Sequence, residues 1–218
     1  MKNIKIVFLL TVFGIINTSI AQSNAKTLLD QVSATMGAYT NMQISFSSSL
    51  SNEDAGVKEG DEDPISGKIS LEGEKYNLAY LGNNFIFDGT KMYVINHEEK
   101  EIAINDGDFD VEDGFIYPSK LLTFYKEGYT FSMGKLKTVR GKKIQFVELT
   151  PIDSNSDIVK VELGIELKTK HIYKLSQLGA NSSKTIFVIT SFKSNQTFPE
   201  NTFTFSKEEY LKKNYSID

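Results

Sequence analysis

Most of this chain alternates apolar and polar residues over short segments that turn residues separate. Asp88-Gly89 marks a tight hairpin, and most other gaps are short enough for hairpins. Strands this closely spaced form an antiparallel sheet that curls or closes. The pattern predicts about ten or eleven strands, at residues 44–50, 69–71, 76–80, 85–87, 92–95, 129–133, 144–149, 159–167, 172–178, 186–192 and 203–205.

Several of these segments are apolar on both faces, for example residues 85–87 and 186–189. The alternative, an outer-membrane barrel, has strands of ~10 residues that alternate apolar-out with polar-in. Residues buried on both faces need cover on each side of the sheet. We therefore predict a curved sheet with helices packed in its concavity.

Two segments have helical patterns. Residues 24–39 place Leu28, Val32 and Met36 on one face at spacings of four, and Gly37 comes near the end of the segment. The second segment, residues 118–125, begins at a proline and is apolar on several sides. Both segments are predicted to lie against apolar surface.

Residues 1–21 have the pattern of a signal peptide. Lys2 and Lys5 precede an apolar run, residues 6–16, and small residues come before Gln22. This run is shorter than the ~20 residues that span a bilayer, although an uncleaved anchor is the alternative. We expect cleavage after Ala21, export, and one domain over residues 22–218.

Composition excludes several kinds of site. The chain has no Cys, no Trp and two His, but 15 Phe and 10 Tyr. Without Cys there is no disulfide framework, thiolate metal site, Cys nucleophile or lipid attachment at the cleavage point. Beyond the signal peptide, 22 basic residues face 28 acidic ones, so no basic stripe for nucleic acid is expected.

Chemical motifs are also missing. Asp106-Gly107-Asp108-Phe109-Asp110 begins like a calcium loop, but Val111 stands where the loop needs glycine and Tyr117 where it needs glutamate. His97 and His171 are predicted to be exposed turn residues. A scattered Ser/His/Asp site stays open, because its members need not be adjacent. No metal, cofactor or enzymatic activity is expected.

An ordered set of segments resembles the periplasmic outer-membrane lipoprotein carrier protein, the LolA family. The resemblance covers roughly residues 25–210. Its members are the helix Ala25–Met36, the strand Met42–Phe46, the Asp88-Gly89 segment from Asn84 to Val94, Leu121-Leu122, Val161–Leu163, and Phe198-Pro199 to Phe203-Thr204-Phe205.

The resemblance implies a mainly β fold, an incomplete (unclosed) antiparallel β-barrel with helices as a lid over an apolar cavity. It also implies a carrier that takes lipoproteins by their acyl chains from an inner-membrane ABC transporter to the outer membrane. The family's Arg-Pro before the third strand, whose Arg holds the lid shut, is replaced here by Glu72-Gly73-Glu74. The latch therefore does not carry over, and the outer-membrane acceptor stays open.

We expect a soluble periplasmic monomer that binds acyl chains. Alternatives are a same-fold module that binds or senses another lipid or glycolipid, a hydrolase, and a structural surface protein. The predicted cavity residues are Leu28, Val32, Met36, Ile44, Phe46, Ile69, Leu71, Tyr76, Leu78, Tyr80, Phe85, Phe87, Met92, Val94, Leu121, Leu122 and Phe124.

Overall fold

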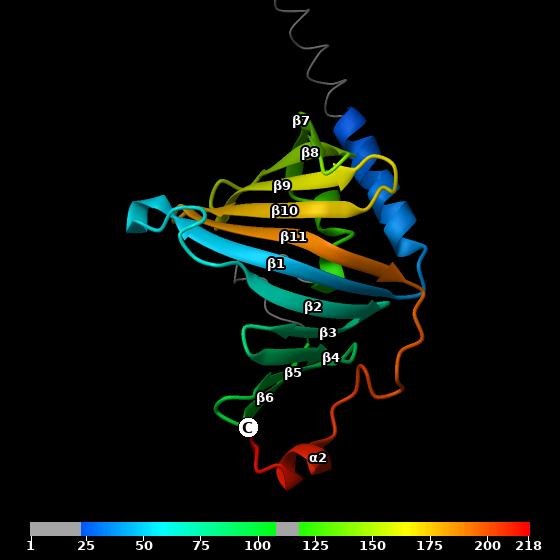
Figure 1. Ribbon diagram of the computed structural model, residues 1–218, viewed down its shortest axis with the longest axis vertical. Coiled ribbons are helices and arrows are strands. Elements are labelled where there is room, and N and C mark those ends of the chain that lie inside the picture. The colour runs from blue at the N-terminus through cyan, green and yellow to red at the C-terminus, as the bar shows by residue number, and fades with distance from the viewer. Residues whose placement is uncertain (1–22, 108–117) are drawn as a thin grey trace, which may run out of the picture.

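The computed structural model describes residues 23–107 and 118–218, and in this part of the chain twelve strands form one sheet (Figure 1). The predicted signal peptide, residues 1–21, and the acidic residues 108–110 lie outside the described residues. The strands are β1 (Met42–Asn52), β2 (Ile65–Glu72), β3 (Lys75–Tyr80), β4 (Asn83–Phe87), β5 (Lys91–Asn96), β6 (Glu101–Asp106), β7 (Tyr129–Val139), β8 (Lys142–Pro151), β9 (Ile158–Glu166), β10 (Ile172–Gly179), β11 (Ser183–Ser194) and β12 (Ser216–Ile217).

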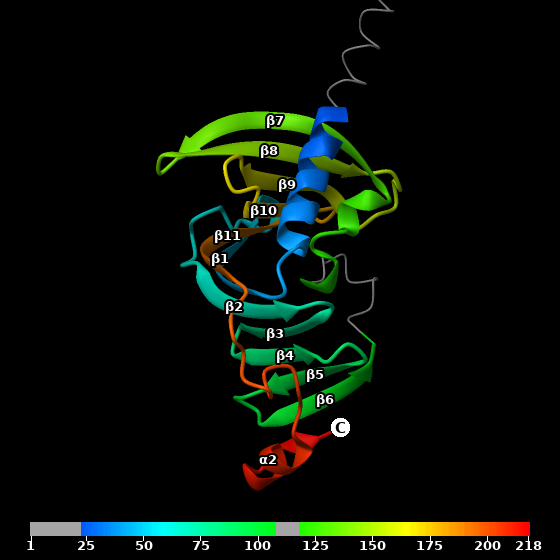
Figure 2. The ribbon, with the colours of Figure 1, turned by 90° about the vertical axis from the view of Figure 1, so that its right-hand side faces the viewer.

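The order across the sheet is β12-β6-β5-β4-β3-β2-β1-β11-β10-β9-β8-β7. Every neighbouring pair is antiparallel except β12 with β6. Since β7 and β12 stand at opposite ends of this order, the sheet is not closed, and Figure 2 shows it curling like an open shell. The predicted unclosed antiparallel barrel is confirmed.

The long pairing of β1 with β11 joins the two halves of the sheet. It runs from Met42 opposite Ser194 to Asn52 opposite Ser183, with a bulge at Ser45/Phe46. The bulge changes which β11 residues face inward, because a register shift of one residue reverses the side-chain alternation. The two halves of the chain therefore share one concave surface.

The N-terminal helix (residues 23–37) packs within this concavity (Figure 2). It buries one face, formed by Ala25, Leu28, Leu29, Val32 and Met36, each at most 6% exposed. That face joins the main hydrophobic core with side chains from both halves of the sheet. Within the described residues, no helix is long and apolar enough to cross a membrane.

Two local predictions were wrong. Residues 118–125 do not form one helix but two 3₁₀ turns, η3 (Pro118–Lys120) and η4 (Phe124–Lys126). Thr123 makes no side-chain cap for the second turn, and an isolated helix this short is held by packing rather than by its own bonds. Residues 203–205 are not a strand but turn and irregular backbone.

Phe203 and Phe205 alternate with polar residues for a reason other than strand formation. Phe203 is buried, and the ring of Phe205 stacks on Tyr93 of β5 with centroids 4.5 Å apart. These side chains cover the sheet rather than extend it. The strands β6 and β12 were not predicted, since each offers only a short apolar pattern beside polar residues.

A second, smaller hydrophobic cluster lies apart from the main core. Ile86, Ile95 and Ile102 of β4–β6 are buried in it beneath the C-terminal segment, which includes α2 (Lys207–Lys212). Phe205 also stacks on Tyr210, with ring centroids 5.3 Å apart. The pairing of β12 with β6 covers that edge of the sheet.

We predict that Phe205→Ala lowers the free energy of unfolding by about 1–3 kcal/mol, because it removes both ring contacts and leaves a gap over β5. Urea denaturation measures the change. Leu211→Ala on α2 is the matched control: its side chain is 50% exposed, and a change below about 0.5 kcal/mol is expected. Equal losses in the two variants would contradict this role of Phe205.

Candidate functional site

An apolar cavity opens on the concave side of the sheet where β1 and β11 meet. Three sources form its wall: both halves of the sheet, the end of the N-terminal helix, and the segment that carries η3. The lining residues are Met36, Ile44, Phe46, Ile69, Leu71, Leu78, Tyr80, Pro118, Leu121, Ile172, Leu175, Gln177, Phe187, Ile189 and Phe192.

The cavity offers apolar contact and little else. Its empty space is about 870 Å³ when the open solvent at its mouth is included. Among the lining residues, only Gln177 and Tyr80 carry polar side-chain groups. The hydroxyl of Tyr80 lies 2.7 Å from Ser48 Oγ, so its hydrogen bonding is satisfied within the wall.

Three aromatic rings pack together in this wall. The ring centroid of Phe46 lies 5.6 Å from that of Tyr80 and 5.5 Å from that of Phe187. Gly67 on β2 makes room for Phe46, since a Cβ at this position would overlap the ring. The absence of a side chain at Gly67 therefore lets the Phe46 ring lie against β2.

Two hydrogen bonds tether the helix beside the cavity. Tyr125 of η4 donates its hydroxyl proton to Asp30 Oδ1 over 2.9 Å. At the end of the helix, Tyr39 Oη lies 2.9 Å from His171 Nε2, and the His171 ring packs on Phe192 of the wall with centroids 4.1 Å apart. The prediction that His171 is an exposed turn residue was wrong. Burial lowers its pKa.

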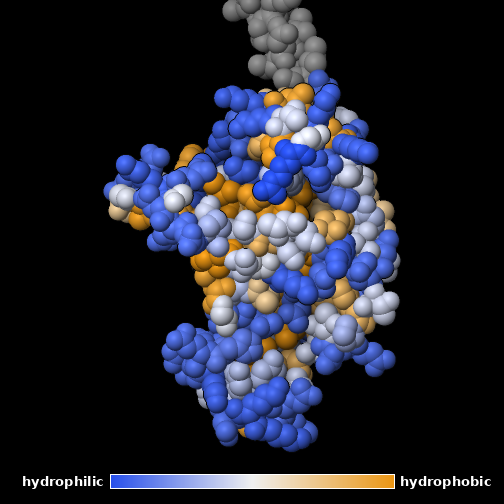
Figure 3. Space-filling view, in the orientation of Figure 1, coloured by the Kyte–Doolittle hydropathy of each residue, from blue (hydrophilic) through white to orange (hydrophobic). Residues whose placement is uncertain are grey.

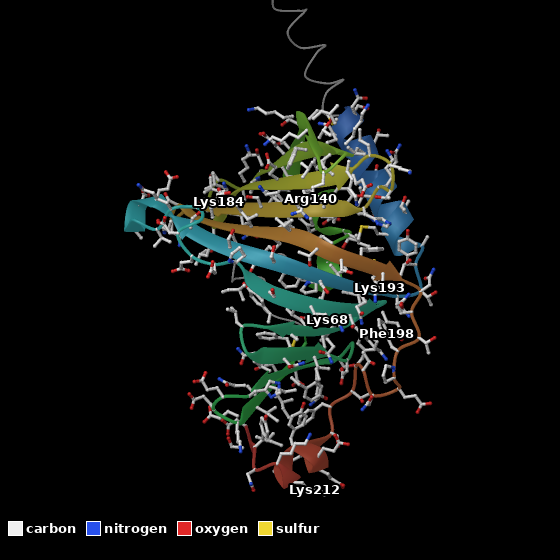
Figure 4. The ribbon with its side chains drawn as sticks, in the orientation of Figure 1. Lys68, Arg140, Lys184, Lys193, Phe198 and Lys212 are labelled. Atoms are coloured by element: carbon white, nitrogen blue, oxygen red, sulfur yellow. The ribbon has the colours of Figure 1, made fainter. Side chains whose placement is uncertain are left out.

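Arg140 takes no part in this tether. It lies exposed in the turn between β7 and β8, labelled in Figure 4, and that hairpin projects away from the helix in Figure 2. His97, by contrast, is exposed as expected, and its ring nitrogens contact Tyr215 and Asn84. Among the described residues, no group of three or more His, Asp or Glu could hold a metal ion.

The structure divides the predicted cavity residues into two sets. The wall of the cavity contains Met36, Ile44, Phe46, Ile69, Leu71, Leu78, Tyr80 and Leu121, and Leu122 lines an adjoining hollow. The other set packs into the adjacent core rather than onto the cavity wall: Leu28, Val32, Tyr76, Phe85, Phe87, Met92, Val94 and Phe124.

The sequence analysis missed the contribution of β10 and β11. Both strands were predicted, but nothing in the sequence placed them beside β1. The bulge also brings Phe192 opposite Ile44 and Ile189 opposite Phe46, a spacing of three rather than two. The residues missed are Pro118, Ile172, Leu175, Gln177, Phe187, Ile189 and Phe192.

The adjoining hollow measures about 500 Å³ and lies where the helix ends. Met36, Leu71, Pro118 and Leu121 line both spaces. The remaining lining residues of this second hollow are Gly37, Tyr39, Thr40, Asn41, Met42, Gly73 and Leu122.

No family model and no curated protein matches the sequence. Solved structures match at low identity. An uncharacterized conserved protein from Thermus thermophilus has a TM-score of 0.58 and 9% identity, over 89% of this chain and 98% of that chain. A LolA superfamily protein from Nitrosomonas europaea has a TM-score of 0.42 and 11% identity, over 83% and 97%.

A putative outer membrane lipoprotein-sorting protein domain from Vibrio parahaemolyticus has a TM-score of 0.45 and 13% identity, over 85% of this chain and 97% of that chain. At these identities the likeness is one of fold alone. The architecture itself, an unclosed antiparallel sheet with a helix and short turns over an apolar cavity, is the one that the resemblance to the LolA family implied. The fold is therefore the unclosed antiparallel barrel that the sequence predicted, and the Thermus thermophilus protein shares it.

We predict that Gly67→Ala weakens binding of an acyl probe about tenfold or more, because the new methyl group pushes the Phe46 ring into the cavity. Fluorescence titration with a pyrene-labelled fatty acid measures the affinity. Ser66→Ala, at the neighbouring exposed position of β2, should bind like the wild type. Unchanged affinity in Gly67→Ala would show that Phe46 does not limit the cavity.

The helix tether should weaken at alkaline pH. Burial first, and then the Asp30 carboxylate, raises the pKa of Tyr125 to about 12, against ~10 in an unfolded chain. The neutral phenol is favoured in the fold, so its stabilisation is full below pH ~10 and is lost as the pH rises towards 12.

Tyr125→Phe keeps the ring and removes this titration. We predict that its free energy of unfolding falls less steeply between pH 10 and 12 than that of the wild type. At pH 7 the variant should be less stable by about 1 kcal/mol, since it loses a hydrogen bond to a carboxylate. Denaturant titrations across this pH range measure both effects, and parallel pH profiles would contradict the prediction.

Proposed function

We propose that this protein is a soluble periplasmic carrier that binds the acyl chains of lipoproteins in its apolar cavity and shuttles them from the inner to the outer membrane. The observation that carries the proposal is the cavity wall, which is apolar almost throughout and lies open on one side. Such a wall can hold hydrocarbon chains without recognising a particular chemical group.

The energetics of an exposed acyl chain favour this function. Each CH₂ group left in water costs about 0.8 kcal/mol, so a chain of ~16 carbons costs roughly 12 kcal/mol. A carrier must offset this cost and still release its cargo. Contacts with Met36, Leu121 and the aromatic rings of the wall are apolar and adaptable, which suits release better than a set of directional polar contacts.

The partners in this proposal are acylated lipoproteins and an inner-membrane ABC transporter that hands them over. The lid would open without the arginine latch of the LolA family, since Asp30–Tyr125 and Tyr39–His171 tether the helix instead. These are single hydrogen bonds, each worth about 0.5–3 kcal/mol. The buried face of the helix holds it more strongly than these bonds, so bound acyl chains must replace its apolar contacts in order to displace it.

A release assay tests the proposal. Purified protein is incubated with inner membranes that carry labelled lipoproteins, and the soluble fraction is searched for a one-to-one complex. The proposal predicts such a complex. Absence of both lipoprotein release and acyl-probe binding would refute it, whereas binding of free lipids without lipoprotein release would favour the same-fold module with another cargo.

A matched pair of variants locates the site. Leu78 and Val94 are both half-buried on the concave side, but only Leu78 lines the cavity. We predict that Leu78→Gln weakens acyl-probe binding about tenfold, because its amide loses hydration when a chain binds, and that Val94→Gln has little effect. Equal affinities in two folded variants would place the chains elsewhere.

A further inference from the structure

The second hollow adjoins the apolar cavity. Met36, Leu71, Pro118 and Leu121 are among the lining residues of both spaces, so the two spaces meet at these residues. A molecule whose chain fills the cavity can therefore extend its other end into this hollow. The inference below rests on the proposed function, because it concerns the head of the same acylated molecule.

The wall changes character between the two spaces. The second hollow adds the polar side chains of Tyr39, Thr40 and Asn41, and backbone at Gly37 and Gly73. Asn41 is fixed in place, since its amide group bonds both the N–H and the carbonyl of Gln196. This end of the site can therefore accept polar groups that the cavity would exclude.

The electrostatics of the second hollow disfavour anions. The 23–37 helix ends at Gly37, and the last carbonyl groups of a helix carry partial negative charge. Glu72 and Glu74 flank Gly73 in the exposed turn after β2. No Lys, Arg or His is among the described residues that line the hollow.

Three basic side chains lie near the hollow in sequence or space, and none of them lines it; Lys120 is exposed on η3. Lys75 lies against Gly89, and its charge helps to lower the pKa of Asp88 against the opposing effect of burial, so it serves the β4–β5 turn. His171 stands behind Tyr39 rather than on the surface of the hollow, and burial lowers its pKa, which keeps it neutral at neutral pH.

We propose that the second hollow is a head-group subsite that takes uncharged or cationic heads with N–H or O–H donors, and discriminates against phosphates and carboxylates. Glycerol hydroxyls and peptide N–H groups match its carbonyl and side-chain acceptors. A ligand bound in the opposite direction would place its head near Gln177, whose side chain is the one amide group of the cavity wall.

Two ligands that differ by one phosphate group test this selectivity. Monopalmitoylglycerol and palmitoyl lysophosphatidic acid share the chain and the glycerol, and each is used to displace a pyrene-labelled monoacylglycerol from the full mature chain. We expect the wild type to bind the neutral ligand about tenfold more tightly. Similar affinities for the two ligands would overturn the proposed subsite and leave the carrier function standing, whereas displacement by neither would overturn both.

Charge substitutions in the second hollow and at Gln177 distinguish the two directions in which the ligand could lie. Thr40 is exposed and lines only the second hollow, so Thr40→Lys should shift the preference towards the phosphate about tenfold. Thr40→Arg repeats the test should the first variant fold poorly, as thermal unfolding would report. Gln177→Lys should leave the ratio of the two affinities unchanged. A shift in Gln177→Lys with none at position 40 would reverse the assignment.

Discussion

In the part of the chain that the structure describes, the concave face of the sheet has more apolar surface than the elements over it bury, and the arrangement around the cavity follows from this mismatch. One helix and two 3₁₀ turns lie over a surface to which both halves of the sheet contribute. Where Leu28, Leu29 and Val32 contact it, the result is an ordinary core. Beyond the helix end at Gly37, the same surface is left as the wall of a cavity.

Contacts outside the cavity stabilise the sheet around it. The aromatic cluster of Phe205, Tyr210 and Tyr215 packs on β4–β6 apart from the main core, and the β1–β11 pairing holds the two halves together. The surface in Figure 3 is polar over much of this view, with apolar patches at its left rim below the projecting loop. Leu50 and Ile65, more than 40% exposed, flank that loop.

Much of the fold was predictable, because the alternation of apolar and polar residues and the positions of turn residues are local features of the sequence. The sequence predicted the N-terminal helix, ten of the twelve strands and one side of the cavity, including Ile44 and Ile69. It could not predict the other side, since the pairing of β1 with β11 joins residues about 140 positions apart and a bulge alters its parity. The sequence also could not distinguish residues of the cavity wall from residues of the core. Leu78 and Val94 both follow the alternating pattern of a strand, but only Leu78 lines the cavity.

The most direct test of the central claim is to locate a bound acyl chain by NMR. A fatty acid with a nitroxide near its methyl end is added to protein with labelled isoleucine methyl groups. Binding in the cavity predicts strong broadening of the Ile69, Ile172 and Ile189 signals, while Ile95 and Ile102 of the outer cluster stay sharp. Broadening confined to the outer cluster, or no broadening at saturating ligand, would contradict an acyl-chain site in this cavity.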